Sequence, residues 1–248
     1  MNIVILAAGV GNRLRPFTTE HPKCLLSFGG KSLLQRHLEM VNGLAVGKIT
    51  IVVGHLADQV EAEVERLCVR QHIQLVYNSQ YTLGSALSLL QAQAALGSDP
   101  AIIMDADLLL CRDMVTSLFT SSAPSCLLAD PRLIDTGEEV KVLVRSDGTV
   151  CELGKHVHRG GSVAGESVGI YKFSPEAGQT LVAMLKRRVG ENPGLEYEAI
   201  IDSVLDKVQM HYLSVGEFPW IEIDFPDDVE RARKEIWPLI SRRDLVAS

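Results

Sequence analysis

The sequence predicts a single α/β domain with a Rossmann-like, doubly wound mixed sheet that is mostly parallel. Short apolar runs recur through the first half of the chain, and stretches with helical periodicity separate them. Strands that alternate with helices of about 10–15 residues are typical of βαβ units and a parallel sheet. Apolar residues make up 46% of the 248 positions, which is sufficient for one ordinary core. The expected strands of this half cover residues 2–8, 48–53, 73–77 and 101–104, and the expected helices cover 32–41, 57–69 and 84–96.

The pattern changes after about Asp113, where strands become more frequent. A serine followed by Pro175 predicts the capped start of a helix, and Pro226 starts a final amphipathic one. A glycine-rich segment at 160–165 predicts a flexible loop. No linker, repeat or low-complexity segment interrupts the chain, which favours one domain over 1–248. The expected strands here cover residues 125–129, 139–145, 149–152, 167–173, 211–215 and 221–223, with a further helix over 197–205.

Composition excludes several classes of function. The chain has 24 Lys and Arg against 31 Asp and Glu, giving a net charge of −7, and it has no long basic run; nucleic acid is therefore not an expected partner. No apolar run approaches the roughly 20 residues of a membrane helix, and no membrane partner is expected. The first residues lack the basic flank of a signal peptide, which predicts a cytoplasmic protein. The five cysteines never occur at C-x-x-C spacing, which favours reduced thiols.

The most informative segment follows the first expected strand and reads Leu-Ala-Ala-Gly-Val-Gly-Asn-Arg from residue 6 to 13. Glycines at the carboxyl end of a strand allow backbone N–H groups to approach phosphates closely. The planar guanidinium group of Arg13 can form two hydrogen bonds with a phosphate, and Lys23 supplies a compact positive charge. The dinucleotide fingerprint needs glycine at position 14, which is Leu14, and a Walker A loop needs glycine at position 25, which is Leu25.

Residues 6–30 resemble the signature L-A-A-G-x-G-x-R-L-x-P-x-T…P-K-x-L-L-x-x-x-G of the NTP-transferase family, the sugar-nucleotide pyrophosphorylases and their relatives. The chain departs from it at Cys24 and Ser32, where many members carry proline. The resemblance implies that residues 1–112 form a nucleotide-binding half and 113–248 an acceptor-binding half. It also implies that Arg13 meets the β and γ phosphates and that Lys23 bridges the α-phosphate and the acceptor's phosphate. The residues that it places around the nucleotide are Leu6, Ala7, Ala8, Gly9 and Gly11.

Two acidic segments are candidates for a metal site. Asp105 and Asp107 end the fourth expected strand, and Asp224 follows a short strand far along the chain. Mg²⁺ prefers one or two carboxylates together with phosphate oxygens and water. The resemblance assigns Asp107 and Asp224 as Mg²⁺ ligands and leaves Asp105 beside the nucleotide in a supporting role. Asp224 could also cap the helix that begins at Pro226.

This arrangement predicts a mechanism without a protein nucleophile. An acceptor phosphate with a second pKa near 6 is largely dianionic at pH 7 and can attack the α-phosphorus in line. The protein then supplies positioning, and Mg²⁺, Arg13 and Lys23 neutralise the developing charge. The partners are a nucleoside triphosphate and a small phospho- or phosphono-acceptor.

The segment after the third strand is expected to lie against the base, although an ordinary turn and helix cap would look the same. The sequence has no hexapeptide repeat, and its Trp-Ile-Glu-Ile-Asp ending resembles phosphocholine and aminoalkylphosphonate cytidylyltransferases, which implies CTP and an amine-bearing acceptor. A basic cluster near Lys155 could reach a phosphonate or be a solvated loop. The candidates for reading the base are Asn78, Gly84 and Ser85. A second set consists of acidic and aromatic residues that could contact a cationic acceptor or could serve packing alone. Its members are Tyr171, Glu196, Tyr197, Glu198, Asp202, Trp220 and Glu222.

Two other functions remain open at this point. One is a sugar-1-phosphate nucleotidyltransferase that uses UTP, dTTP or GTP. The other is a nucleotide sensor without turnover, and the presence of Lys23, Asp107 and Asp224 favours an enzyme over it. The sequence is compatible with a homodimer.

Overall fold

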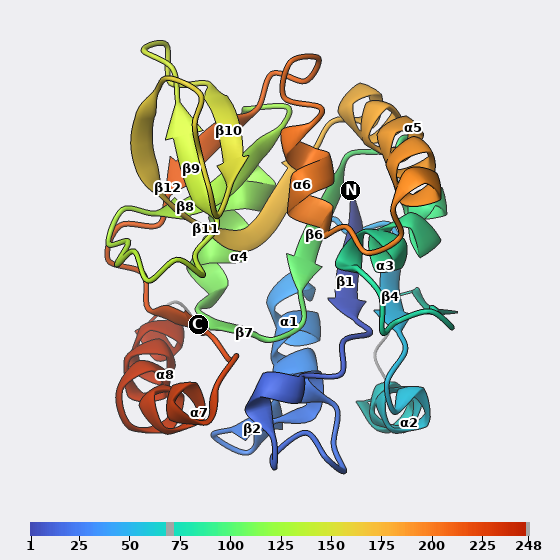
Figure 1. The fold of residues 1–248 in the computed structure, drawn as a ribbon. Coiled ribbons are helices and arrows are strands. Elements are labelled where there is room, and N and C mark those ends of the chain that lie inside the picture. Colours follow the sequence, from blue (N-terminus) through green and yellow to red (C-terminus); the bar gives the residue numbers. More distant parts are fainter. Residues whose placement is uncertain (68–71, 247–248) are drawn as a thin grey trace.

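The computed structural model describes residues 1–67 and 72–246, and within them nine strands form one mixed sheet (Figure 1). The order is β10-β9-β11-β6-β1-β4-β5, with β8 paired to β11 and β12 paired to β8. Strand β1 pairs in parallel with β4 and β6, whereas β11 is antiparallel to β6, β8 and β9. The strands are β1 (Asn2–Ala7), β4 (Ile49–Val53), β5 (Ile73–Tyr77), β6 (Ala101–Asp105), β8 (Cys126–Asp130), β9 (Lys141–Val144), β10 (Val150–Gly154), β11 (Ser162–Phe173) and β12 (His211–Ser214).

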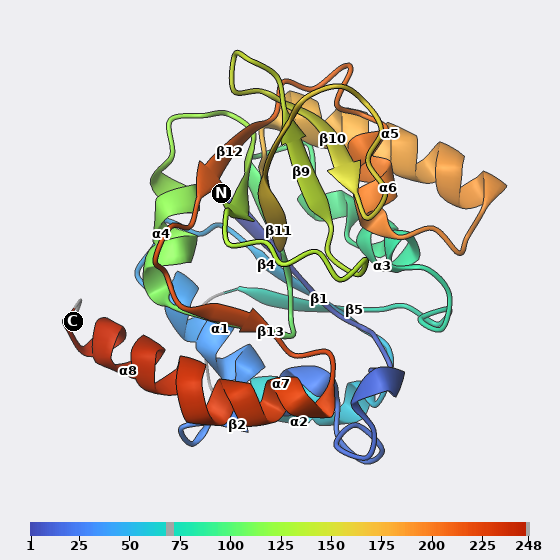
Figure 2. The same ribbon diagram turned by 60° about the vertical axis from the view of Figure 1, so that its left-hand side comes forward.

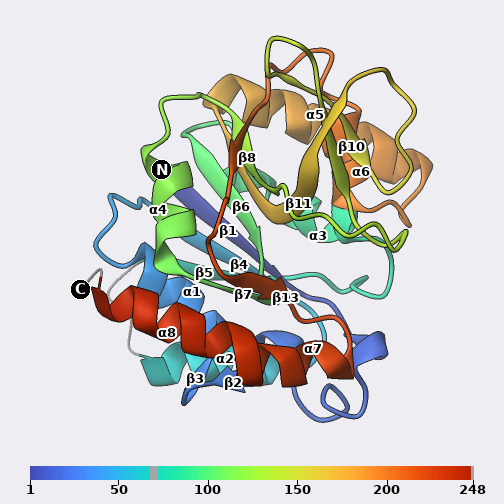
Figure 3. The same ribbon diagram turned by 90° about the vertical axis from the view of Figure 1, so that its left-hand side faces the viewer.

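Helices cover both faces of this sheet, as expected for a doubly wound fold. One face carries α1 (Leu33–Val41), α2 (Ala57–Leu67), α4 (Arg112–Thr120), α7 (Pro226–Arg231) and α8 (Trp237–Val246). The other face carries α3 (Ser85–Gln91), α5 (Pro175–Glu191) and α6 (Tyr197–Asp202). Figure 3 shows α7 and α8 below the sheet and α5 above it.

Alternation along the strands explains the two cores. Ile3 and Ile5 of β1 contribute to the core on the α1 face, and Val4 between them contributes to the core on the α3 face. A strand buried on both faces reads as a continuous apolar run, which is why the first half of the sheet was predictable. The mixed, doubly wound α/β fold is confirmed.

Two small ladders complete the structure around the carboxyl end of the main sheet. Strand β7 (Leu108–Leu110) pairs antiparallel with β13 (Trp220–Glu222), and β2 (Ser27–Phe28) pairs with β3 (Lys31–Ser32). Figure 2 shows β13 running next to α7. Short 3₁₀ turns cover Asn12–Leu14, Lys23–Leu25 and Gln93–Ala95, and a π-helical turn at Ala232–Ile236 joins α7 to α8.

The predicted flexible loop at 160–165 is partly wrong, because β11 already begins at Ser162 and pairs there with Val144 of β9. Gly165 serves close backbone packing: a Cβ at this position would lie 2.1 Å from the carbonyl oxygen of Asp130. The helix expected over 84–96 ends at Gln91, and that over 197–205 ends at Asp202. The last two residues of the helix expected over 57–69 lie outside the described residues.

Two further features bear on the predictions from composition. Within the described residues, no helix combines the length and the apolar character that crossing a membrane requires. The four described cysteines are buried and free, as expected for reduced thiols.

Candidate active site

A cleft of about 1530 Å³ opens at the carboxyl ends of β1 and β6. Its walls come from the loop after β1, the β6–β7 turn, β13, the start of α6 and the segment 131–140 between β8 and β9. In an open α/β sheet, ligands bind beyond the carboxyl ends of the parallel strands. Both halves of the chain therefore contribute to one cleft.

The loop after β1 presents backbone to this cleft. Gly11 has a left-handed φ of +65°, and its carbonyl oxygen accepts a hydrogen bond of 2.7 Å from Thr18 Oγ1. A Cβ at Gly11 would meet Thr18 Cγ2 at 3.0 Å, whereas nothing lies within 4 Å of the corresponding position on Gly9. Gly9 therefore leaves open space through which a phosphate can reach the main chain. The predicted residues from Leu6 to Gly11 all line the cleft.

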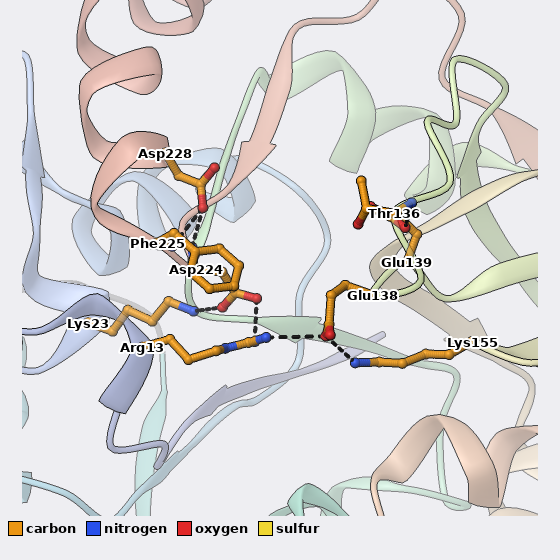
Figure 4. Close-up of polar contacts among 9 residues, drawn as sticks. All are labelled: Arg13, Lys23, Thr136, Glu138, Glu139, Lys155, Asp224, Phe225 and Asp228. Carbon is orange, nitrogen blue, oxygen red and sulfur yellow. Dashed lines mark hydrogen bonds and ion pairs between the residues drawn. The ribbon is translucent and has the colours of Figure 1, made fainter.

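Lys23 lies at the centre of the polar network. Its Nζ is 2.6 Å from Asp107 Oδ2 and 2.5 Å from Asp224 Oδ1, although Lys23 and Asp224 are 201 residues apart in sequence. Arg13 Nη2 contacts the other oxygen of Asp224 at 2.5 Å (Figure 4). Burial alone would lower the pKa of Lys23, but Asp107 and then Asp224 raise it above its ordinary value, so the ammonium stays charged.

A third carboxylate joins this centre. Asp107, Glu222 and Asp224 each offer an oxygen within 4.8 Å of the others. The β7–β13 ladder and the hydrogen bond from Ile223 N to Asp107 O bring the two segments together. Enclosure by the cleft walls, then Asp107 and Asp224, raise the pKa of Glu222 to about 8. Glu222, predicted to contact the acceptor, lines the cleft and lies next to the two predicted metal ligands.

The alternative role of Asp224 as a helix cap is wrong. The side chain that caps α7 is Asp228, whose Oδ2 accepts from the backbone N–H of Asp224 at 3.0 Å and of Phe225 at 2.7 Å. The carboxylate of Asp224 is therefore directed to Lys23 and Arg13.

Asp105 belongs to a buried polar chain. The hydroxyl of Tyr197 donates to Asp105 Oδ2 at 2.5 Å, the ring of Tyr171 packs edge-on against Tyr197 at 5.7 Å, and the Tyr171 hydroxyl contacts Ser167 Oγ at 2.6 Å. Burial, then Asp107, hold the pKa of Asp105 well above its usual range. The two tyrosines are at most 2% exposed, so the expectation that they offer ring faces to an acceptor is wrong. They support Asp105 from inside the cleft wall.

Only part of the predicted base-reading segment reaches the cleft. Asn78 is buried, and its side chain donates to Ser88 Oγ at 3.0 Å. The backbone of Gly84 packs directly against the backbone of Leu195, so closely that a Cβ on Gly84 would lie 2.0 Å from the Leu195 carbonyl oxygen. Both residues therefore hold α3 in place and do not line the cleft. Ser85 does line it, and its N–H donates to Glu196 Oε2 at 3.2 Å.

Of the remaining candidates for contacting the acceptor, some line the cleft and others do not. Asp202 accepts from Arg159 Nη2 at 2.7 Å and from Leu153 N at 3.0 Å, so it fastens the β10 hairpin to α6 and does not line the cleft. Trp220 lines the cleft, and its Nε1 donates to Asp130 Oδ2 at 2.6 Å. Lys155 is the member of the predicted basic cluster that reaches the cleft.

The structure adds cleft residues that the sequence did not single out. Asp130 accepts hydrogen bonds from Arg132, and Glu166 lies opposite Asp130 in the β8–β11 ladder. Burial, then Asp130 and Glu139, raise the pKa of Glu166 to about 7. These residues carry no motif: their only signal was a position near the end of a predicted strand.

Comparison with known proteins now identifies the family. The family model described as the MobA-like NTP transferase domain matches residues 3–149. The chain belongs to this family. It is a nucleotidyltransferase, and the resemblance noted in residues 6–30 is confirmed at the level of the family.

Curated relatives of this NTP transferase include several cytidylyltransferases. The chain is 24% identical to CTP:phosphoglutamine cytidylyltransferase of Campylobacter jejuni, over 93% of the chain and 98% of the relative. It is 24% identical to choline-phosphate cytidylyltransferase of Haemophilus influenzae, over 96% and 98%. A 33% identical match to the Streptococcus pneumoniae choline-phosphate enzyme spans 49% of the chain and 51% of that protein.

Solved structures share the fold. The inositol-1-phosphate CTP transferase from T. maritima has a TM-score of 0.78 at 19% identity, covering 97% of the chain and 95% of the other. The CTP:phosphocholine cytidylyltransferase from Streptococcus pneumoniae has a TM-score of 0.76 at 21% identity, covering 94% and 97%.

Proposed function

We propose that this NTP transferase moves CMP from CTP to a small acceptor that carries a phosphate or phosphonate and an amine, and releases pyrophosphate in a Mg²⁺-dependent reaction. The observation that carries the proposal is the convergence of Lys23, Asp107 and Asp224, from three distant segments, at the mouth of a glycine-rich strand-end loop. Lys23 lies between the two carboxylates, and Arg13 contacts one of them. Carboxylates that could hold a metal and cations that could hold phosphates therefore lie side by side.

The residues present fit Mg²⁺. Hard cations prefer oxygen ligands, and Asp107, Glu222 and Asp224 offer three convergent carboxylates. Among the described residues, the buried Oδ1 of Asp107 has no hydrogen-bond partner, which is costly unless a ligand completes it. Asp107 and Asp224 would hold the ion, with Glu222 beside them. When bound, Mg²⁺ supplies charge neutralisation at the phosphates and orients them.

The chain's own residues supply the remaining functions. Arg13 binds the outer phosphates with its fork, and Lys23 holds the α-phosphate and the attacking acceptor oxygen close together. The acceptor phosphate attacks the α-phosphorus, the bond to the β-phosphate oxygen breaks, and pyrophosphate leaves. The charged Lys23 stabilises the negative charge that develops on the α-phosphate oxygens.

The choice of CTP rests on the relatives, whose names specify CTP or cytidylyl transfer. The choice of an amine-bearing acceptor rests on the acidic residues along the acceptor side of the cleft. Glu166 and Glu198 line the cleft, and burial raises the pKa of each to about 7, with like charges nearby. An ammonium group on the acceptor would compensate such carboxylates, whereas a neutral sugar would offer hydrogen bonds only.

The test is a matrix of donors and acceptors read by pyrophosphate release. CTP, UTP, dTTP and GTP are each combined with phosphocholine, 2-aminoethylphosphonate and glucose-1-phosphate, with Mg²⁺ and again with EDTA. We expect CTP with an amine-bearing acceptor to be fastest, and EDTA to abolish turnover. Faster turnover of UTP, dTTP or GTP with the sugar phosphate would establish the sugar-1-phosphate alternative.

A further inference from the structure

The cleft contains an anion-binding position that a side chain of the protein itself fills. Glu138 Oε2 lies 2.8 Å from Lys155 Nζ and 3.4 Å from Arg13 Nη1. A single oxygen thus contacts two cations, one from the nucleotide loop and one from the end of β10. Figure 4 shows Asp224, Arg13, Glu138 and Lys155 forming a continuous charged row.

The segment 131–140 is folded so that it presents Glu138 to these cations. Glu139 accepts from the backbone N–H of Thr136 at 2.8 Å and from its hydroxyl at 2.7 Å. Asp135 accepts from Gly137 N at 3.1 Å and pairs with Lys141 Nζ at 2.9 Å. These contacts define the shape of the turn without using the Glu138 carboxylate, so the carboxylate can leave while the turn persists.

The Glu138 oxygen lies between two cations, a position that an anionic phosphate oxygen could also occupy. The hydrogen bond from Lys155, its charge and that of Arg13 lower the pKa of Glu138, so the group is ionised at neutral pH. The side chains of Arg13, Glu138 and Lys155 are 49%, 59% and 46% exposed. Ion pairs this exposed are weak and exchange readily with competing anions.

Arg13 remains positioned when Glu138 leaves. Asp224 contacts its Nη2 at 2.5 Å, and its guanidinium lies 4.9 Å from the centre of the Phe225 ring. Release of Glu138 therefore exposes an arginine that is already oriented, together with a neighbouring lysine.

We propose that Glu138 is a built-in competitor of the donor's phosphates: in the free enzyme it neutralises Arg13 and Lys155, and a triphosphate or pyrophosphate must displace it to bind. This inference rests on the proposed function, because that function places phosphates at Arg13. Glu138 then sets the affinity for nucleotide and for the pyrophosphate product without taking part in the transfer.

The test uses Mg²⁺ with inorganic pyrophosphate as the probe, because pyrophosphate has no base and needs no acceptor. Calorimetric titration compares the wild type with Glu138→Gln and Glu138→Ala. The control is Glu39→Gln on α1, outside the cleft. This substitution removes the same charge from an ion pair, in which Glu39 lies 2.7 Å from Lys31 and both side chains are partly exposed. We expect both Glu138 variants to bind pyrophosphate about three- to tenfold more tightly, as loss of weak exposed pairs allows. The control should match the wild type.

A second measurement follows the Glu138 carboxylate itself. The carboxyl-carbon NMR signal of Glu138 in the wild type should shift when pyrophosphate is added, because Glu138 loses both cations, whereas amide exchange over 131–140 should stay the same because the turn keeps its own hydrogen bonds. Equal or weaker pyrophosphate binding by the Glu138 variants would overturn the competitor role while leaving the proposed function intact. If the wild type bound neither pyrophosphate nor CTP in the presence of Mg²⁺, the proposed function would fail, and the competitor role would fail with it.

Discussion

At the scale of single residues, Lys23 connects the stability of the site to its chemistry. Its side chain is 13% exposed and lies between two carboxylates that are themselves only about one-fifth exposed, at 21% and 23%. Removing one partner of such a buried group leaves like charges facing each other, which typically costs about 3–5 kcal/mol when fully buried. Although Lys23 lies in a loop, its position between two partly buried carboxylates makes its removal costly to the fold.

Lys23→Ala should therefore have two effects. Turnover should fall by a few hundredfold, roughly 3–4 kcal/mol of transition-state stabilisation, because one preorganised donor is lost. The melting temperature should also fall in EDTA, and Mg²⁺ should restore much of it by compensating Asp107 and Asp224. Pyrophosphate-release kinetics and thermal unfolding with and without Mg²⁺ measure both. Lys31→Ala, which removes an exposed lysine from outside the cleft, is the control. A Lys23 variant with more than half of the wild-type turnover would exclude it from the site.

At the scale of elements, α3 depends on a backbone contact with the segment that leads into α6. Gly84 N donates to Pro193 O at 3.1 Å, and Ala86 N donates to Leu195 O at 3.1 Å. A Cβ on Gly84 would lie 2.0 Å from the carbonyl oxygen of Leu195, so main chain would have to move. Gly84→Ala should lower the free energy of unfolding by about 2–4 kcal/mol, near the upper end of overpacking costs.

The matched control is Gly190→Ala near the end of α5. A Cβ there would meet nothing within 4 Å, and alanine is the better helix former, so this variant should gain about 0.5–1 kcal/mol. Urea unfolding of both variants gives the comparison. A Gly84→Ala variant as stable as the wild type would show that the two segments separate easily. Base reading by Gly84, the original prediction, would instead predict lost nucleotide affinity at unchanged stability.

The same elements explain what the sequence could and could not predict. Apolar runs predicted β1, β4 and β6 because strands buried on both faces leave a local signal, and they also predicted β5, the partly exposed edge strand. The phosphate loop and Asp107 follow directly after such strands, so they were predictable as well. The place of Glu222 beside the predicted metal ligands depends on the β7–β13 ladder, a long-range pairing that periodicity does not contain. Asp202 and Tyr197 looked like site residues because residue type alone does not reveal which side chain is already satisfied.

At the scale of the whole molecule, the cleft concentrates acids that an unfolded chain would keep apart. Glu166 faces Asp130 on β8 and Glu139 on the adjoining segment, with Arg132 and Arg231 as nearby cations. Burial, then Asp130 and Glu139, raise its pKa from 4.5 to about 7. The folded state therefore keeps a proton on Glu166 that the unfolded chain has already released.

This difference predicts how stability changes with pH. Between about pH 4.5 and 7 the folded state binds more protons at Glu166 than the unfolded state, so the free energy of unfolding falls as pH rises and levels off above 7. Glu166→Gln removes this contribution. The free energy of unfolding of the variant minus that of the wild type should therefore be about 1–2 kcal/mol larger at pH 8 than at pH 5, after discounting for partial exposure. Glu176→Gln is the control, because its own backbone N–H and Ser174 lower the pKa of Glu176 below 4.5, so its effect on stability should be nearly the same at pH 5 and pH 8. Urea unfolding at both pH values measures the differences. Equal stability offsets for Glu166→Gln at pH 5 and pH 8 would show that Glu166 titrates alike in the folded and unfolded chain.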